Sequence, residues 1–119
     1  MNAPDEAVTR PPLVRDDERG VATLTLNRPS QFNALDVALL DALERELASI
    51  GADSRVRVVV LAGAGRAFCP GHDLKEMLAN CDEAFVGNLF RRCCDVMLAL
   101  QRIPQPVIAK VHGIATAAG

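Results

Sequence analysis

The sequence predicts an α/β domain built on a mostly parallel sheet. Apolar and polar residues alternate on both sides of a polar turn at residues 16–20. An amphipathic segment over residues 35–50 follows, and a β-branched run comes directly after it. A helix that connects two neighbouring strands of one sheet favours parallel pairing and a right-handed crossover. Glycines follow the apolar runs, as expected where strands end in tight loops.

Composition limits the function classes. Half of the 119 residues are apolar, which is enough for one small domain with a core. The net charge is −2 and the chain has no Trp or Tyr, so we expect no nucleic-acid partner. The first twenty residues fit neither a secretory signal nor a transit peptide, and no apolar run approaches the roughly 18 residues of a membrane span. A cytoplasmic protein without a membrane partner is therefore expected.

The N-terminal half predicts a tail, a hairpin and a helix. Residues 1–11 are rich in charge and proline and are expected to be flexible, with the domain spanning residues 12–119. Residues 12–27 predict a β-hairpin whose turn lies at 16–20, with Ala22, Leu24 and Leu26 on one face. Pro29 ends the second strand, and apolar residues from Leu35 onward recur at helical spacing until Gly51.

The C-terminal half predicts two further strands that alternate with helices. Residues 55–64 read as a buried strand, and Asp73 is placed to cap a helix of one or two turns. A longer helix is expected over 83–101, with its apolar positions at Phe85, Leu89, Met97, Leu98 and Leu100. Prolines end it, "PVIAKVHG" predicts a short buried strand, and "GIATAAG" is typical of a turn into a helix. Parallel sheets are usually covered on both faces, so we expect this chain to be part of a larger protein.

Several common kinds of site do not fit. The glycines at 63 and 65 are not followed by the third glycine of a dinucleotide-binding loop, and no phosphate-binding Gly-Lys-Ser/Thr is present. His72, Asp73 and His112 have no diagnostic metal-ligand spacing, and no serine lies in a G-x-S-x-G turn. The four cysteines are expected to be reduced, with Cys69 a buried apolar residue rather than a nucleophile.

The remaining possibility is a site made of backbone. The loops "PGHD" and "GIATAAG" each follow a strand, and at the strand ends of one sheet they would lie side by side. Each loop could then direct an N–H group at a substrate carbonyl oxygen. A pair of such donors stabilises an oxyanion or an enolate.

Three segments in order resemble the crotonase superfamily of enoyl-CoA hydratases and isomerases. They are "VATLTLNRPSQFNALD", "VRVVVLAGAGRAFCPGHDLKEM" and "PQPVIAKVHGIATAAG". The resemblance implies a crotonase-like ββα spiral fold, of which the chain holds the N-terminal part, a hairpin and βαβ units, without the C-terminal helices. It also implies an acyl-CoA substrate and a trimer or hexamer, with no metal and no cofactor beyond coenzyme A within the substrate.

The same resemblance assigns roles to single residues. The backbone N–H groups of His72 and Ala118 would donate to the thioester oxygen. From the residues themselves, we expect the His72 side chain to be either a spectator or a contact to the acyl group or the coenzyme, and Asp73 to be a helix cap rather than a base. Residues expected to bind the substrate are Ser30, Gln31, Phe32, Ala34, Pro70, Gly71, Asp73, Leu74, Thr116 and Ala117.

Two departures from the family pattern bear on activity. Ala117-Ala118-Gly119 stands where the family often has three glycines, which keeps the N–H groups but narrows the turn. The family's catalytic glutamates would lie beyond Gly119, the first of them two positions on. We therefore expect an enoyl-CoA hydratase/isomerase-like protein whose oxyanion site is present and whose acid and base residues are not. The alternatives are a non-catalytic acyl-CoA-binding or assembly module, or a sibling reaction such as thioester hydrolysis or dehalogenation.

Overall fold

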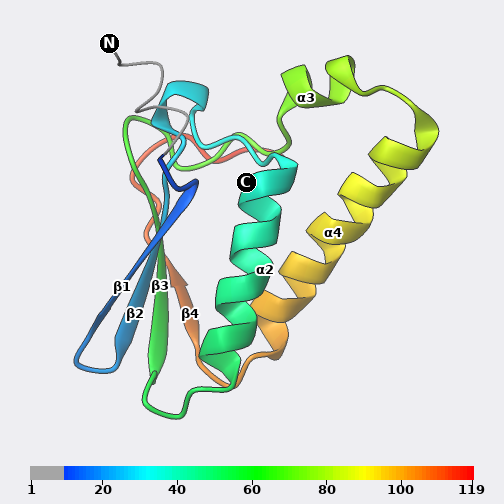
Figure 1. Ribbon diagram of the computed structural model, residues 1–119. Coiled ribbons are helices and arrows are strands. Elements are labelled where there is room, and N and C mark those ends of the chain that lie inside the picture. Colours follow the sequence, from blue (N-terminus) through cyan, green and yellow to red (C-terminus); the bar gives the residue numbers. More distant parts are fainter. Residues whose placement is uncertain (1–9) are drawn as a thin grey trace.

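The structure is a computed structural model that describes residues 10–119, so most of the expected flexible tail lies outside the described residues. Its sheet has four strands in the order β1-β2-β3-β4 (Figure 1). These are β1 (Leu13–Glu18), β2 (Val21–Leu26), β3 (Val58–Gly63) and β4 (Val107–Ala109). β1 and β2 are antiparallel, whereas β2–β3 and β3–β4 pair in parallel. The predicted α/β class is confirmed.

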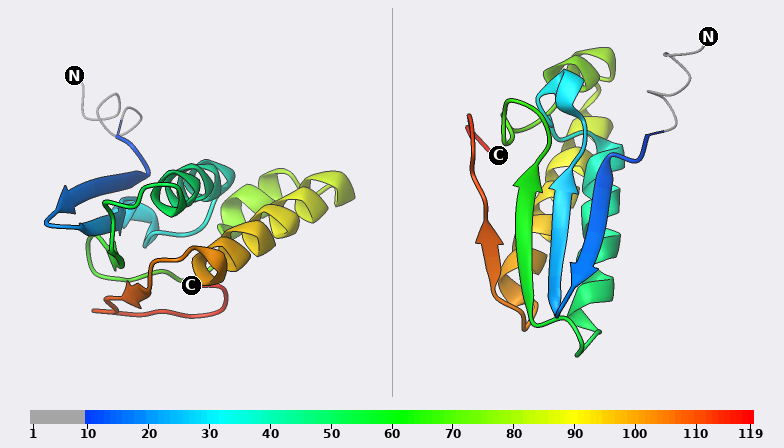
Figure 2. Two further views of the ribbon diagram at one scale, coloured as in Figure 1. Left: turned by 90° about the horizontal axis from the view of Figure 1, so that it is seen from below. Right: turned by 90° about the vertical axis from the view of Figure 1, so that its left-hand side faces the viewer.

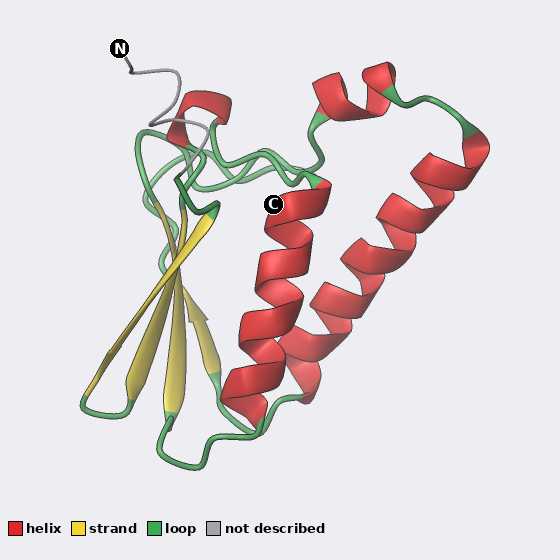
Figure 3. Cartoon of the chain, viewed as in Figure 1, coloured by secondary structure: helices red, strands yellow, loops and turns green. Residues whose placement is uncertain are grey.

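The helices lie on one side of the sheet. After the short 3₁₀ helix η1 (Pro29–Gln31) come α2 (Val37–Gly51), α3 (Leu74–Ala79) and α4 (Glu83–Arg102). α2 packs beside the sheet and α4 packs against α2 (Figures 2 and 3). Among the described residues, no helix covers the opposite face of the sheet.

The hairpin turn is tighter than the sequence predicts. β1 continues through Glu18, which pairs with Val21, so only Arg19 and Gly20 remain in the turn. Both have positive φ values, 52° and 82°, as two-residue hairpin turns of the I′ type require. The predicted alternation in β2 is confirmed, since Ala22, Leu24 and Leu26 are all buried.

The core lies between the sheet and the two long helices. The Asp36 side chain caps α2 by accepting a hydrogen bond from the Leu39 N–H at 2.9 Å. Six residues of α2 are buried between the sheet and α4: Leu39, Leu40, Ala42, Leu43, Leu47 and Ile50. Each fully buried leucine contributes about 1.5–3 kcal/mol by leaving water.

Two burial predictions near the C-terminus were wrong. α4 buries Leu89, Cys93 and Val96, whereas Leu98 is 40% exposed. β4 was expected to be buried, but Ile108 is 55% exposed. The cause is position, because β4 is an edge strand and its outer surface has no cover among residues 10–119. The last residues also form a turn closed by a Gly119 N–H to Thr116 carbonyl bond, and no helix begins there within the described chain.

The loops at one end of the sheet bring distant segments together. The carboxyl ends of the three parallel strands, the start of α2 and the whole of α3 meet there, at the upper end in Figure 1. In α/β proteins this end of the sheet is the usual place for a ligand. None of the helices in the described part of the chain is long and apolar enough to cross a membrane.

Candidate functional site

A buried asparagine holds two of the loops together. The Asn33 side chain is fully buried, and its amide nitrogen lies 2.9 Å from the Ala64 carbonyl oxygen and 3.0 Å from that of Ala67. The amide oxygen accepts a 2.8 Å hydrogen bond from the Arg28 N–H. With φ 64°, Asn33 occupies the left-handed region, which asparagine tolerates better than most residues. The loop after β2 is thereby fixed to the loop after β3.

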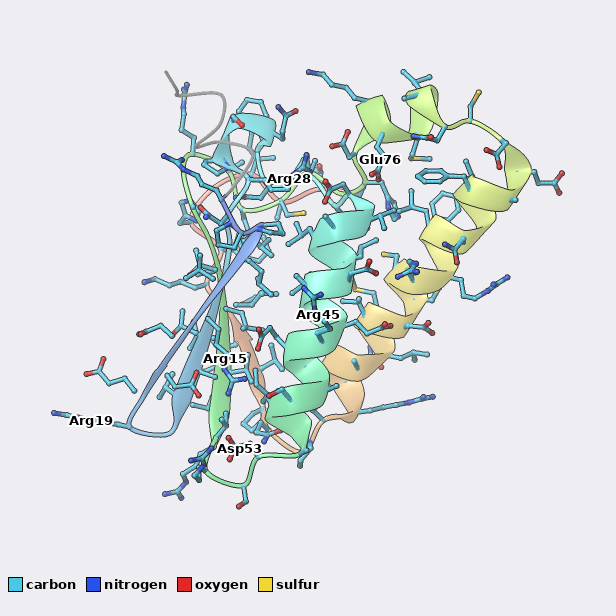
Figure 4. All side chains as sticks on the ribbon, viewed as in Figure 1. Arg15, Arg19, Arg28, Arg45, Asp53 and Glu76 are labelled. Atoms are coloured by element: carbon cyan, nitrogen blue, oxygen red, sulfur yellow. The ribbon has the colours of Figure 1, made fainter. Side chains whose placement is uncertain are left out.

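Charged residues fix the loop that precedes α3. Asp73 is 7% exposed and caps α3 by accepting a 3.1 Å hydrogen bond from the Glu76 N–H. Arg28 donates to the Asp73 carboxylate at 3.0 Å and also to the Ala34 carbonyl. Figure 4 shows Arg28 and Glu76 beside the start of α2, where the Glu76 carboxylate accepts from the Val37 N–H at 3.1 Å.

The pKa values of these two carboxyl groups move in opposite directions. Burial alone would raise the pKa of Asp73, but the Glu76 N–H and the Arg28 guanidinium outweigh it and hold the pKa below its usual value. Burial raises the pKa of Glu76, despite its hydrogen bond from Val37. Asp73 therefore caps α3, as the sequence predicts, and its carboxylate holds the loop through Arg28.

The backbone around His72 is held on both sides. The Leu35 N–H donates to the Gly71 carbonyl at 2.7 Å, and the Asp73 N–H donates to the Leu35 carbonyl at 2.9 Å. The His72 N–H lies between these two bonds and donates to no acceptor among residues 10–119. A fixed, unpaired N–H is available to a ligand.

The final turn of the chain carries a second N–H without an acceptor and packs against Gly71. The Phe68 N–H donates to the Ile114 carbonyl at 2.9 Å, and the Thr116 N–H donates to the Cys69 carbonyl at 3.1 Å. Gly71 has φ 102°, and a methyl group in place of its hydrogen would lie 3.1 Å from the Ala118 nitrogen. In the described part of the chain the Ala118 N–H also has no acceptor.

An open cleft of about 490 Å³ lies beside these groups. It is bounded by the η1 loop, the loop before α3, α3 itself, α4 and the last turn. Seven of the residues predicted to form the site line it: Gln31, Ala34, Pro70, His72, Asp73, Leu74 and Ala117. The other five do not line it: Gly71 packs against Ala118, Ser30 and Thr116 are exposed, and Phe32 is 55% exposed.

The His72 side chain packs against α4. Its ring lies edge-on to that of Phe90, with 5.0 Å between the ring centres and 86° between their planes. Partial burial lowers the pKa of His72, which favours the neutral imidazole. Nδ1 is buried and has no hydrogen-bond partner in the described residues.

Sequence reasoning missed Arg28, Asn33 and Phe90. All three act through contacts with residues distant in sequence, so spacing along the chain gave little sign of them. The clearest available signal was Asn33, because asparagine next to a turn often adopts a left-handed conformation.

Two other expected features concern cysteines and metals. All four cysteines are free. Cys69 is buried, and burial raises the pKa of its thiol, which fits an apolar packing role. Within residues 10–119, no group of three or more His, Cys, Asp or Glu side chains is placed to hold a metal ion.

Comparison with known proteins gives a consistent result. The family model for enoyl-CoA hydratase/isomerase matches residues 16–119. Enoyl-CoA hydratase domain-containing protein 3, mitochondrial, from Xenopus laevis is 34% identical over all of this chain and 40% of its own length. A probable enoyl-CoA hydratase from Mycobacterium tuberculosis is 40% identical over 90% of this chain and 40% of its own length.

Solved structures agree with the sequence relatives. An enoyl-CoA hydratase from Mycobacterium smegmatis is 60% identical with a TM-score of 0.90, over 92% of this chain and 43% of that structure. A structure from Pseudomonas aeruginosa is 39% identical with a TM-score of 0.86, over 93% of this chain and 48% of its own. The chain spans about two fifths of the length of the curated relatives it matches. It belongs to the enoyl-CoA hydratase/isomerase family of the crotonase superfamily, whose members act on acyl-CoA substrates.

Proposed function

We propose that this protein binds an acyl-CoA thioester and stabilises the negative charge that develops on its carbonyl oxygen through the backbone N–H groups of His72 and Ala118. One observation carries the proposal. Both N–H groups lack acceptors within residues 10–119, and Gly71, the residue before His72, packs closely against the turn that carries Ala118. Two donors on rigid loops are the arrangement that stabilises an oxyanion or enolate.

The energetic argument rests on rigidity. Donors that are already oriented need no reorganisation when charge develops, and each contributes about 3 kcal/mol to transition-state stabilisation. The loop that carries His72 is held by Leu35 on both sides and by the Arg28–Asp73 ion pair below it. The loop that carries Ala118 is held by backbone bonds to Phe68 and Cys69. The same bonds that stabilise the fold therefore fix the donors.

The coenzyme is assigned to the cleft beside the η1 loop. Gln31, Ala34 and Pro70 line that cleft, and Lys75 places a cation at its edge. A cation suits the phosphates of coenzyme A, and the apolar wall suits the uncharged arm that carries the thioester.

Proton transfer is assigned to groups outside residues 10–119. Asp73 is committed to Arg28 and to the cap of α3, and it stays ionised in both roles. The His72 ring faces Phe90, and its Nδ1 is buried. The family acts by hydration or isomerisation, and which of these reactions this protein performs follows from the residues that supply the acid and base.

The test is the carbonyl stretching frequency of a bound thioester, measured by isotope-edited difference infrared spectroscopy on the full-length protein. Hydrogen bonds from two N–H groups polarise the carbonyl and lower its frequency. Gly71→Ala forces a methyl group toward Ala118 at a position with φ 102°, so the shift should largely disappear. Gly87→Ala is the matched control, because a methyl group at Gly87 meets nothing within 4 Å.

The outcomes separate the possibilities. A shift in the unmodified protein and in Gly87→Ala, lost in Gly71→Ala, supports the proposal. Thioester binding without any shift contradicts the oxyanion role and favours a non-catalytic binding module. A shift accompanied by thioester hydrolysis or dehalogenation, without hydration or isomerisation, keeps the oxyanion role and assigns a sibling reaction.

A further inference from the structure

A second cleft adjoins the first at His72. It has a volume of about 560 Å³ and is lined by His72, Phe90, Cys93, Cys94, Met97 and Leu98. His72 and Phe90 are the two residues that it shares with the first cleft. We propose that the His72–Phe90 pair divides the site into a coenzyme cleft and an acyl cleft, and sets the size of the acyl group that the protein accepts. This inference rests on the proposed function.

The two clefts differ in chemistry. The first has the amide of Gln31 and the cation of Lys75 in its lining, beside an apolar wall. The second has no Asp, Glu, Lys or Arg side chain in its wall, and thiol, thioether and hydrocarbon groups make up most of it. Such a surface binds hydrocarbon, with each buried methylene contributing about 0.8 kcal/mol. The acyl chain of a thioester, rather than the polar coenzyme, fits the second cleft.

The position of the second cleft agrees with the proposed donors. His72 lines it, and His72 carries the first N–H group. Met97 also lines it, and Met97 borders a small void whose wall includes Ala118. A thioester carbonyl held by both N–H groups would therefore lie at the division, with the coenzyme on one side and the acyl chain on the other.

Packing, without a hydrogen bond, holds the division in place. The two rings meet edge to face at 5.0 Å, a geometry that contributes about 0.5–1.5 kcal/mol beyond burial alone. His72 Nδ1 has no hydrogen-bond partner in the described chain, so no hydrogen bond at this atom fixes the imidazole. Phe90 is 45% exposed, which leaves room for its ring to be removed without opening the core. Changes at either residue should alter the division while the fold is kept.

The experiment compares dissociation constants measured by isothermal titration calorimetry on the full-length protein. The ligands are free coenzyme A, a straight four-carbon acyl-CoA and an aromatic acyl-CoA. In His72→Ala and in Phe90→Ala the two clefts merge, so the affinity ratio of aromatic to straight thioester should rise about tenfold. The affinity for free coenzyme A should change much less than this ratio, because Gln31 and Lys75 of the first cleft are kept.

Two matched variants alter one cleft each. Leu98→Ala enlarges only the second cleft and should weaken straight-chain binding without changing the affinity for free coenzyme A. Leu74→Ala alters only the first cleft and should lower the affinity for all three ligands by the same factor. Phe90→Leu keeps an apolar side chain and serves as a milder form of Phe90→Ala, with circular dichroism confirming the fold of each variant.

The outcomes distinguish this inference from the function on which it rests. If the unmodified protein binds none of the ligands, the proposed function fails and the inference fails with it. A second outcome is that the unmodified protein binds thioesters with the same ratio of aromatic to straight-chain affinity as His72→Ala, Phe90→Ala and Phe90→Leu. In that case the His72–Phe90 pair does not divide the site, and the proposed function stands. A ratio that rises in the His72 and Phe90 variants, and not in Leu74→Ala, supports the division.

Discussion

Asn33 shows how one side chain can position a whole loop. It is fully buried, has a left-handed backbone and lies within hydrogen-bond distance of three carbonyl groups, those of Ala64, Ala67 and Phe68. A buried carbonyl without a partner costs about 1–3 kcal/mol. No other side chain of similar size offers both donors and an acceptor and also tolerates this backbone.

We expect Asn33→Ala to lower the free energy of unfolding by about 3 kcal/mol, because buried backbone groups lose their partners. Asn33→Gly separates the two causes, since glycine accepts a φ of 64° but has no amide. Urea unfolding of both variants is the measurement. If Asn33→Gly unfolds like the unmodified protein, backbone strain and not hydrogen bonding is the reason for Asn33. Asn88→Ala, at an exposed position of α4, is the control and should change stability by less than about 0.5 kcal/mol.

Asp73 gives a prediction about pH. Its pKa in the folded protein is lower than in the unfolded chain, so its ionised form stabilises the fold. This contribution is fully present above the ordinary Asp value of about 3.9 and is lost as pH falls through the lower folded-state value. Asp73→Asn keeps a capping side chain but loses the charge opposite Arg28. We expect it to lower the free energy of unfolding by about 2 kcal/mol at neutral pH.

Unfolding measured at a series of pH values from 7 to 2.5 checks this sign. The difference in free energy of unfolding between the unmodified protein and Asp73→Asn should become smaller as pH falls below about 4. A gap that stays constant over this range would mean that packing, rather than charge, accounts for the role of Asp73. Asp82→Asn is the matched control, because Asp82 caps α4 and forms no ion pair in the described residues.

The segment after β4 shows how two elements can be joined by close backbone contact. A methyl group at Gly113 would lie 2.3 Å from the Arg66 carbonyl oxygen, a distance that real side chains do not reach. His112 adds a 2.7 Å contact from its ring nitrogen to the Gly65 carbonyl. Only glycine therefore allows this segment to lie against the loop after β3.

We expect Gly113→Ala to destabilise the protein by about 2–3 kcal/mol and to separate the two loops. Because Ala118 is carried by the same segment, thioester binding should weaken more than stability alone explains. Thermal unfolding and calorimetric titration with an acyl-CoA measure the two effects, and Gly87→Ala is again the control. Normal binding by a folded Gly113→Ala protein would show that the last turn is positioned without this contact.

The linker between α4 and β4 depends on Gln105. This side chain is 7% exposed, and its amide nitrogen lies 2.7 Å from the Ile50 carbonyl oxygen and 3.2 Å from that of Val56. The end of α2, the start of β3 and the start of β4 are thus connected by one amide.

We expect Gln105→Ala to lower the free energy of unfolding by about 2 kcal/mol. Gln105→Glu should lower it more, because an ionised carboxylate cannot donate a hydrogen bond to a carbonyl. Chemical unfolding at neutral pH measures both. Gln101→Ala is the control, because Gln101 is exposed and lies on α4 four residues earlier. Equal stabilities for the two alanine variants would remove Gln105 from this role.

The elements that sequence predicts well are those set by local pattern. The period-two burial of β2, the leucine spacing of α2 and the Asp73 cap depend on neighbours within a few residues, and all three were confirmed. Asn33, Gln105 and the Arg28–Asp73 pair act between segments that are 31 to 55 residues apart, so no local pattern marks them. The burial of β4 was overestimated for a related reason, because an apolar run does not reveal whether a strand is at an edge.

At the scale of the whole molecule, stability is unevenly distributed. α2 and β3 lie in the core, with Leu39, Leu47 and Val59 fully buried. α3 has no buried residue, and Leu74 and Leu78 are 69% and 78% exposed. In the described chain it is held by the Asp73 cap, by the hydrogen bond that Glu76 accepts from the Val37 N–H, and by partly buried Met77. Segments with few buried contacts open locally without global unfolding.

We therefore expect hydrogen exchange, followed by mass spectrometry, to show fast exchange in α3 and slow exchange in α2 and β3. Glu76→Ala should speed exchange in α3 and leave α2 beyond its first turn unchanged, because only the link between the two helices is lost. α3 forms part of the wall of the first cleft through Leu74 and Met77, so an acyl-CoA that binds there should slow its exchange. Exchange in α3 as slow as in α2 would show that the cleft is rigid before the ligand arrives. Slow exchange only with ligand would mean that binding includes the cost of ordering α3, and that cost sets part of the affinity.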